Sequence, residues 1–118
     1  MIEESLEDRE CLRLVRIVAT RREAVGVHHD TPWLTHWTLH QIAVDDHAIE
    51  AVVRALQASL DTAHPDAWYF DLTNDEWHYI VFKTRIFKVD RANLNEYEAV
   101  RRFGLELGIP DGQLDFIP

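Results

Sequence analysis

Histidine is the side chain best suited to proton transfer near neutral pH, and four of the seven histidines of this chain lie in the stretch VGVHHDTPWLTHWTLHQ, residues 25–41. His28 and His29 are adjacent, whereas His36 and His40 are four residues apart. Two imidazoles at the second spacing bind one metal ion when they lie on a helix. The stretch therefore raises the question whether these histidines bind a metal, act as acid and base, or do neither.

Strand geometry separates His36 from His40. Residues 33–44 are rich in Trp, Thr, Ile and Val and contain no Gly, a composition that predicts a strand. Four residues of a strand span about 13 Å, whereas two imidazoles that share a zinc ion each lie about 2 Å from it. These two histidines therefore do not form the helical metal-binding pair.

A zinc site elsewhere would need ligands from several elements, for instance His28 or His29 with Asp30 and His78. Adjacent loop residues such as His28 and His29 tend to point apart, and the only cysteine, Cys11, has no partner for a metal-binding motif. The sequence therefore predicts no metal and no cofactor.

The alternation of side chains along a strand sorts the stretch into two faces. His36, Thr38 and His40 share one face, and Trp37 and Leu39 share the other. We expect the two apolar residues to enter the core and the two histidines to line the opposite face of the sheet, where they can contact a ligand.

A second cluster of polar residues follows from a hairpin with Asn74 and Asp75 at its turn, since both residue types tolerate turn conformations. This turn sets Asp71 opposite His78 and places Tyr69 on the same side of the hairpin. An aspartate beside a histidine can fix the tautomer of the imidazole for acid-base chemistry, and the tyrosine can orient a substrate. The alternative is an ordinary cross-strand polar pair worth a few tenths of a kcal/mol.

The face that carries His78 also carries Ile80 and Phe82, so it is polar at one end and apolar at the other. A monomer seldom leaves a large apolar patch in water. We expect the first helix, the C-terminal tail, a second subunit or a ligand to cover this face, and we expect Phe116 and Ile117 of the tail to dock.

The hydrophobic periodicity predicts a helix, two strands, a helix, three strands and a last helix. These elements are residues 5–12, 14–20, 33–44, 45–61, 67–73, 76–83, 86–90 and 95–107. For residues 14–20, strand and helix both remain open. The order predicts a single α+β domain over residues 1–118, with a largely antiparallel sheet of four to five strands, two amphipathic helices on one face and a short N-terminal helix.

The β-α-β-β part of this order resembles a ferredoxin-like half-unit. The chain is also similar in general character to small bacterial proteins of unknown function. Neither resemblance implies an activity or a role for any residue.

Composition excludes several classes of partner. Acidic residues outnumber basic ones 21 to 12, and the net charge is −9, which argues against binding to nucleic acid or to anionic membranes. No apolar run approaches the length of a membrane span. The single cysteine permits no internal disulfide and fits a reducing compartment, so we expect a soluble cytoplasmic protein.

Two functions compete. The first is a non-enzymatic binding or interaction module that forms a homodimer or binds a small molecule through its sheet face; it is favoured because the chain lacks every common catalytic motif. The alternative is a small enzyme in which His78 and Asp71, with His36 or His40, perform acid-base chemistry. An acidic mimic of nucleic acid is the least favoured reading, because the acidic residues are mixed with Arg along the chain.

Overall fold

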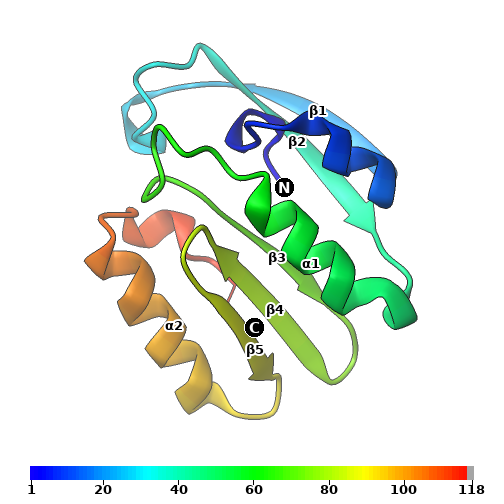
Figure 1. Ribbon diagram of the computed structural model, residues 1–118. Coiled ribbons are helices and arrows are strands. Elements are labelled where there is room, and N and C mark those ends of the chain that lie inside the picture. The colour runs from blue at the N-terminus through cyan, green and yellow to red at the C-terminus, as the bar shows by residue number, and fades with distance from the viewer. Residues whose placement is uncertain (117–118) are drawn as a thin grey trace.

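The strands of the protein form two separate antiparallel sheets in the computed structural model, which describes residues 1–116 (Figure 1). The first sheet pairs β1 (Arg16–Ala24) with β2 (His36–Ala43). The second has the order β3 (Tyr69–Thr73), β4 (Trp77–Phe82) and β5 (Ile86–Asp90). The α+β class is confirmed.

The prediction of one sheet with four or five strands is wrong, because β2 and β3 do not pair. The N-terminal residues lie between them: Ile2 forms an antiparallel bridge with Leu39 of β2. Figure 1 shows the N-terminus in the space between β2 and β3, with α1 (Ile49–Ala58) lying along the same space. A segment remote from both strands in sequence thus takes the position where the two sheets would join.

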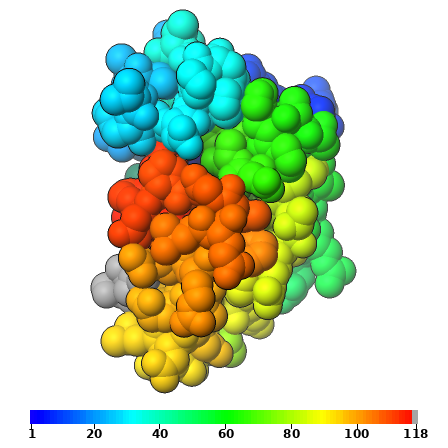
Figure 2. Space-filling view, turned by 90° about the vertical axis from the view of Figure 1, so that its left-hand side faces the viewer, coloured from blue at the N-terminus to red at the C-terminus, as the bar shows by residue number. Residues whose placement is uncertain are grey.

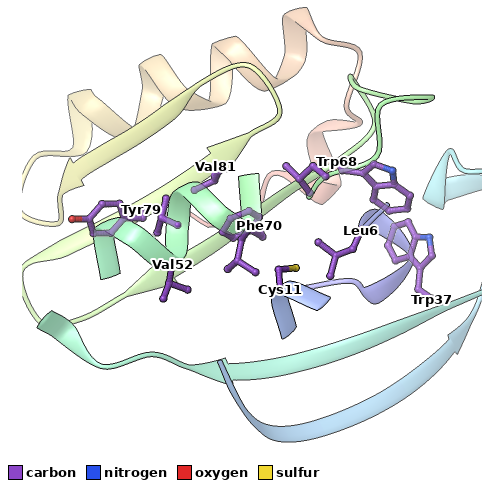
Figure 3. Packing of buried hydrophobic residues seen from close by; sticks show 11 residues of the cluster. Leu6, Cys11, Trp37, Val52, Trp68, Phe70, Tyr79 and Val81 are labelled. Carbon is purple, nitrogen blue, oxygen red and sulfur yellow. The ribbon is translucent and has the colours of Figure 1, made fainter. Parts of the chain in front are cut away.

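The buried apolar residues form two clusters. The α1 cluster contains Leu6, Cys11, Trp37, Val52, Val53, Leu56, Leu60, Trp68, Phe70, Tyr79 and Val81 (Figure 3). The α2 cluster contains Ile80, Phe82, Val89, Tyr97, Val100, Ile109, Leu114 and Phe116. Strand β4 contributes alternate residues to each cluster, so its two faces are both buried.

The two long helices therefore lie on opposite sides of the three-stranded sheet, α1 on one and α2 (Leu94–Glu106) on the other. The expectation that both helices pack on one face is wrong. The reason is visible in the sequence WHYIVF of β4 (Trp77–Phe82), since the run YIVF after His78 does not alternate with polar residues, which is typical of a strand that is covered on both faces.

The face that carries His78 is covered by α2 and by the C-terminal residues Leu114 and Phe116. The fit is close: a methyl group built on Gly104 of α2 would lie 2.7 Å from a methyl carbon of Leu114. The docking of Phe116 is confirmed, and Ile117 lies outside the described residues.

The N-terminal segment forms two 3₁₀ helices, η1 (Glu3–Ser5) and η2 (Arg9–Leu14), in place of the single helix predicted for residues 5–12. Tertiary contacts divide it, because Leu6 is buried and bridges Leu60 after α1. Its cysteine, Cys11, is buried as well.

The segment 14–20, for which strand and helix were both open, is strand from Arg16 onward. Strand β1 is exposed over nearly its whole length, with Ile17 and Val18 43% and 55% exposed. A register shift between Ile17 and Ala19 marks a bulge in the pairing with β2. Strand β1 thus forms an outer edge of the molecule.

The loop before β2 rests on the C-terminal segment, as Figure 2 shows for the light-blue and orange-red residues. The Gln113 amide donates to the carbonyls of His28 and His29, at 3.0 and 2.7 Å. Trp33 in the same loop stacks on His64, with ring centroids 3.8 Å apart. These contacts attach the two-stranded sheet to the rest of the molecule.

Within residues 1–116, no helix combines the length and the apolar character needed to cross a bilayer.

Candidate functional site

Three side chains from β3, β4 and α2 form a hydrogen-bonded chain. The Tyr97 hydroxyl lies 2.9 Å from Nδ1 of His78, and Nε2 of His78 lies 2.7 Å from Oδ2 of Asp71. The structure thus brings together the aspartate and the histidine that the hairpin pattern placed on one face. Tyr97, the third member, lies 19 residues further along the chain, and no sequence pattern connects it with the hairpin.

The register of the hairpin differs from the prediction by two residues. Thr73 lies opposite His78, and Asp71 lies opposite Ile80. The Asn74 side chain accepts hydrogen bonds from two backbone N–H groups, and this shifts the turn by one residue. Because the register changes by an even number, every side chain keeps its face, and Asp71 reaches His78 diagonally.

The hydrogen bonds determine the tautomer of His78. The Tyr97 hydroxyl is buried and has no other hydrogen-bond partner within residues 1–116, so it donates to Nδ1. The imidazole proton is then on Nε2 and is donated to Asp71. Only 7% of the His78 side chain is exposed, and Tyr97 and Asp71 occupy its two ring nitrogens.

The Asp71 side chain is 42% exposed and faces the space between the two sheets. It lines two hollows, one of about 330 Å³ and one of about 470 Å³. Met1 lines both hollows as well, so the two meet at these residues. We call the two hollows together the inter-sheet cleft.

The smaller hollow is acidic. Burial, together with the negative charges of Asp115 and Asp71, raises the pKa of Tyr69 above its ordinary value. The Tyr69 hydroxyl donates to the Gln113 carbonyl and lies 3.4 Å from Asp115. Tyr69, predicted to orient a substrate, is thus held by its own chain. Within residues 1–116, neither Asp71 nor Asp115 forms an ion pair with a Lys or Arg, but the charge of Asp71 acts on the amino group of Met1.

The larger hollow is lined by both polar and apolar side chains, the polar ones including His40, Gln41 and Asp46. The apolar ones include Ile42, Ile49, Leu72 and Trp77. Tyr79 lies there too, where burial and a 2.7 Å hydrogen bond to Glu50 raise its pKa to about 12. Tyr79 is therefore an uncharged donor at neutral pH.

His36 and His40 lie on the first sheet under the N-terminal glutamates. Nδ1 of His40 lies 2.8 Å from the Thr20 hydroxyl and Nε2 lies 3.0 Å from Glu3, so both nitrogens are occupied. His40 lines the larger hollow with Asp71, but no hydrogen bond connects the two. His36 bonds to Arg22 at 2.8 Å, on the exposed side of the sheet. The two histidines therefore do not join the Asp71–His78 pair.

Glu4 completes the polar face of β2, and its pKa is lowered. Burial opposes this shift and is the largest single influence, but hydrogen bonds from the Thr38 N–H and hydroxyl, together with His36, outweigh it. A carboxylate with a lowered pKa in the folded state stabilises the protein above its unfolded pKa. That contribution disappears as the pH falls through the folded pKa.

We expect Glu4→Gln to flatten the dependence of the free energy of unfolding on pH below about pH 4.5, the ordinary glutamate range. Urea denaturation between pH 6 and pH 3 measures this, with the exposed Glu106→Gln as the matched control. An unchanged acid dependence in Glu4→Gln would show that the Thr38 contacts do not hold the charge.

Glu23, His28 and His29 form a group whose potential ligand atoms lie within 4.8 Å of one another. The expectation that the adjacent histidines point apart is wrong: the 3₁₀ helix η3 (Val27–His29) brings their ring centroids to 4.1 Å. Glu23 is separated from this turn in the sequence, so the sequence did not indicate that Glu23 lies beside the two histidines.

The hydrogen bonds of His29 oppose a metal at this group. The Gly26 N–H donates to Nδ1 of His29 at 2.7 Å, so the ring proton is on Nε2, which donates to Glu23 at 2.8 Å. A metal at Nε2 would have to displace that proton while Nδ1 still accepts from the backbone. A metal-binding histidine commonly binds the metal through one ring nitrogen and donates a hydrogen bond from the other, whereas Nδ1 of His29 accepts one.

We therefore expect stoichiometric zinc to leave the melting temperature unchanged. A ligand present at a hundred times its dissociation constant adds about 2.7 kcal/mol to the stability of the folded state, which a thermal melt detects easily. A rise in melting temperature that is abolished by His28→Ala would contradict this expectation.

No protein-family model matches the chain, and neither a curated protein nor a solved structure shows significant similarity to it.

Proposed function

We propose that this chain is a non-enzymatic binding module that takes a ligand with a cationic group into the inter-sheet cleft. The observation that carries the proposal is the position of the Asp71 carboxylate. It is hydrogen-bonded to His78, and the Asp71 side chain is 42% exposed in the cleft. A carboxylate held in a fixed orientation loses little freedom when it binds, and such preorganisation favours affinity.

The charge of the cleft supports a cationic ligand. Asp115 lies near Asp71, and both act on Tyr69. Glu23 lines the same hollow, but Arg21 and His29 already offset its charge. Neither carboxylate pairs with a Lys or Arg, although the amino group of Met1, whose pKa burial lowers, partly offsets the charge of Asp71. The net charge of −9 attracts cations over a longer range.

The burial of His78 favours a binding module over an enzyme. A general base must come within hydrogen-bond reach of the proton that it removes. His78 is buried and bonded on both nitrogens. The cleft also replaces the sheet face as the binding surface, because α2 and the C-terminal residues cover that face. The same proposal places the module in the cytoplasm, where the lone Cys11 stays reduced.

Titration calorimetry with the peptide acetyl-Val-Lys-Val-Lys-Val-amide tests the proposal. A hydrogen bond to a charged group contributes about 1.5–3 kcal/mol, so Asp71→Asn should weaken binding about tenfold or more. The matched control is Asp75→Asn, which removes the same charge from the hairpin turn and should change the affinity by less than about twofold.

Three results would overturn the proposal. The first is the absence of binding at millimolar peptide. The second is equal affinity in wild type and Asp71→Asn. The third is equal affinity for the peptide in which both lysines are replaced by glutamate.

A further inference from the structure

The inter-sheet cleft lies between two strand edges with free backbone groups. From these edges we propose that its ligand is an extended peptide segment, which pairs with β2 and β3 at the same time and joins the two sheets into one. This inference rests on the proposed function, because it assigns a ligand class to the same cleft.

The outer edge of β3 has unpaired backbone groups. The Asn74 N–H donates to the Trp77 carbonyl, which makes this the hydrogen-bonded pair of the hairpin. Bonded and non-bonded pairs alternate along an antiparallel ladder, so the N–H and C=O groups of Asp71 and Thr73 point away from β4. Within residues 1–116, no backbone group pairs with them.

The outer edge of β2 is partly occupied. The His40 N–H donates to the Met1 carbonyl at 2.7 Å, and the Met1 nitrogen donates to the His40 carbonyl at 2.9 Å. By the same alternation the backbone of Ile42 faces this edge too. In the described part of the chain, Ile42 has no backbone partner there.

Both free edges line the larger hollow of about 470 Å³, with residues 41–44 on one side and residues 71–74 on the other. The arrows of β2 and β3 point the same way in Figure 1, and Ile2 runs antiparallel to β2. A peptide that follows the direction of Ile2 would therefore be antiparallel to both strands. The chain's own residues Met1 and Ile2 already show this mode of pairing at one end of the cleft.

The two sides of the cleft require different side chains from the peptide. Leu72 and Trp77 on one side belong to the surroundings of the α1 cluster and are apolar. Asp71 lies on the other face of β3, toward His78. Alternate residues of a strand point to opposite faces, so the peptide that fits best alternates apolar and basic residues.

A peptide that pairs with two edges can be distinguished by experiment from a peptide that pairs with a single edge. At a single edge only alternate residues of an added strand use their N–H groups. Between two edges every N–H is used. Strand addition of this kind is a known mode of peptide recognition, in which main-chain hydrogen bonds provide affinity.

The test uses acetyl-Val-Lys-Val-Lys-Val-amide and two backbone-methylated versions, one with N-methyl groups on the valines and one on the lysines. Both methylated peptides should bind at least about tenfold more weakly than the parent, the effect of losing hydrogen bonds worth about 1 kcal/mol each. The protein carries its purification tag at the C-terminus, because residues added before Met1 would enter the same space.

Amide hydrogen exchange with the parent peptide locates the pairing. The amides of Ile42, Asp71 and Thr73 should exchange at least about tenfold more slowly in the complex, since exchange reports the opening of hydrogen bonds. The matched control is the amide of Lys88, which faces the outer edge of β5 by the same alternation. Protection of Lys88 in place of the three cleft amides would overturn the proposal.

The results separate this inference from the proposed function. If only one methylated peptide binds weakly, the ligand adds to a single edge and the two-edge pairing is wrong. If neither methylated peptide binds more weakly than the parent while Asp71→Asn still reduces the affinity, the proposal of a binding module is retained and the proposal of strand addition is wrong. If the parent peptide does not bind, both the proposed function and the inference of strand addition are wrong.

Discussion

Phe82→Ala is expected to lower the free energy of unfolding by about 3–5 kcal/mol, the usual cost of truncating a buried phenylalanine. Phe82 is fully buried in the α2 cluster. Its ring centroid lies 4.9 Å from that of Phe103, 5.6 Å from that of Tyr69 and 6.0 Å from that of Phe87. Alanine would leave a cavity among three rings that belong to different elements and cannot close together.

Urea denaturation measures this effect, with Phe87→Ala as the control because Phe87 packs against the same cluster but is only half-buried. Phe87→Ala should lower the free energy of unfolding by distinctly less than Phe82→Ala does. Equal losses in the two variants would show that α2 does not cover this face of β4 as described.

Leu56→Ala is expected to cost about 2–5 kcal/mol. Leu56 is a fully buried residue of the α1 cluster, on the opposite side of the three-stranded sheet from Phe82. Leucine and alanine are both good helix formers, so the loss reports packing and not helix propensity.

The matched control is Leu105→Ala in α2, where the leucine is 38% exposed. Substitutions at the surface usually change stability by less than about 0.5 kcal/mol. A loss below about 0.5 kcal/mol for Leu56→Ala would mean that α1 does not bury its side of the three-stranded sheet. Because β4 lies between the two clusters, both variants should also retain a single cooperative transition.

The two long helices and the faces of the hairpin strands could be predicted because their signals are local. The i, i+3, i+4 pattern of α1 and the stop signals after α2 lie within the elements themselves. The faces of β3 and β4 follow from alternation, so Asp71 and His78 meet although the predicted register was two residues away.

The division into two sheets could not be predicted, because it depends on contacts between segments that are remote in sequence. Met1 and Ile2 pair with β2 nearly forty residues away. The acidic start of the chain carries no periodic pattern that indicates this role. The strand WHYIVF did contain a usable signal, since its run YIVF does not alternate with polar residues and so indicates burial on both faces.

The candidate site was accessible to sequence reasoning only in part. The Asp71–His78 pair follows from the hairpin, but Tyr97 and Asp115 come from the last helix and the C-terminal segment, which no local pattern connects to the hairpin. The histidines of the opening stretch have structural partners: Glu23 bonds to His29, and Glu3 bonds to His40. These partners lie on other segments.

The location of a bound cationic peptide is the measurement that tests the account most directly. Acetyl-Val-Lys-Val-Lys-Val-amide with a nitroxide label at its C-terminus should broaden the amide signals of residues that line the inter-sheet cleft, among them Ile42 and Thr73. At a peptide concentration near the dissociation constant of the wild type, the broadening should be several times weaker in Asp71→Asn. Broadening centred on the exposed edge β1 or on the outer surface of α2, unchanged in Asp71→Asn, would contradict the account.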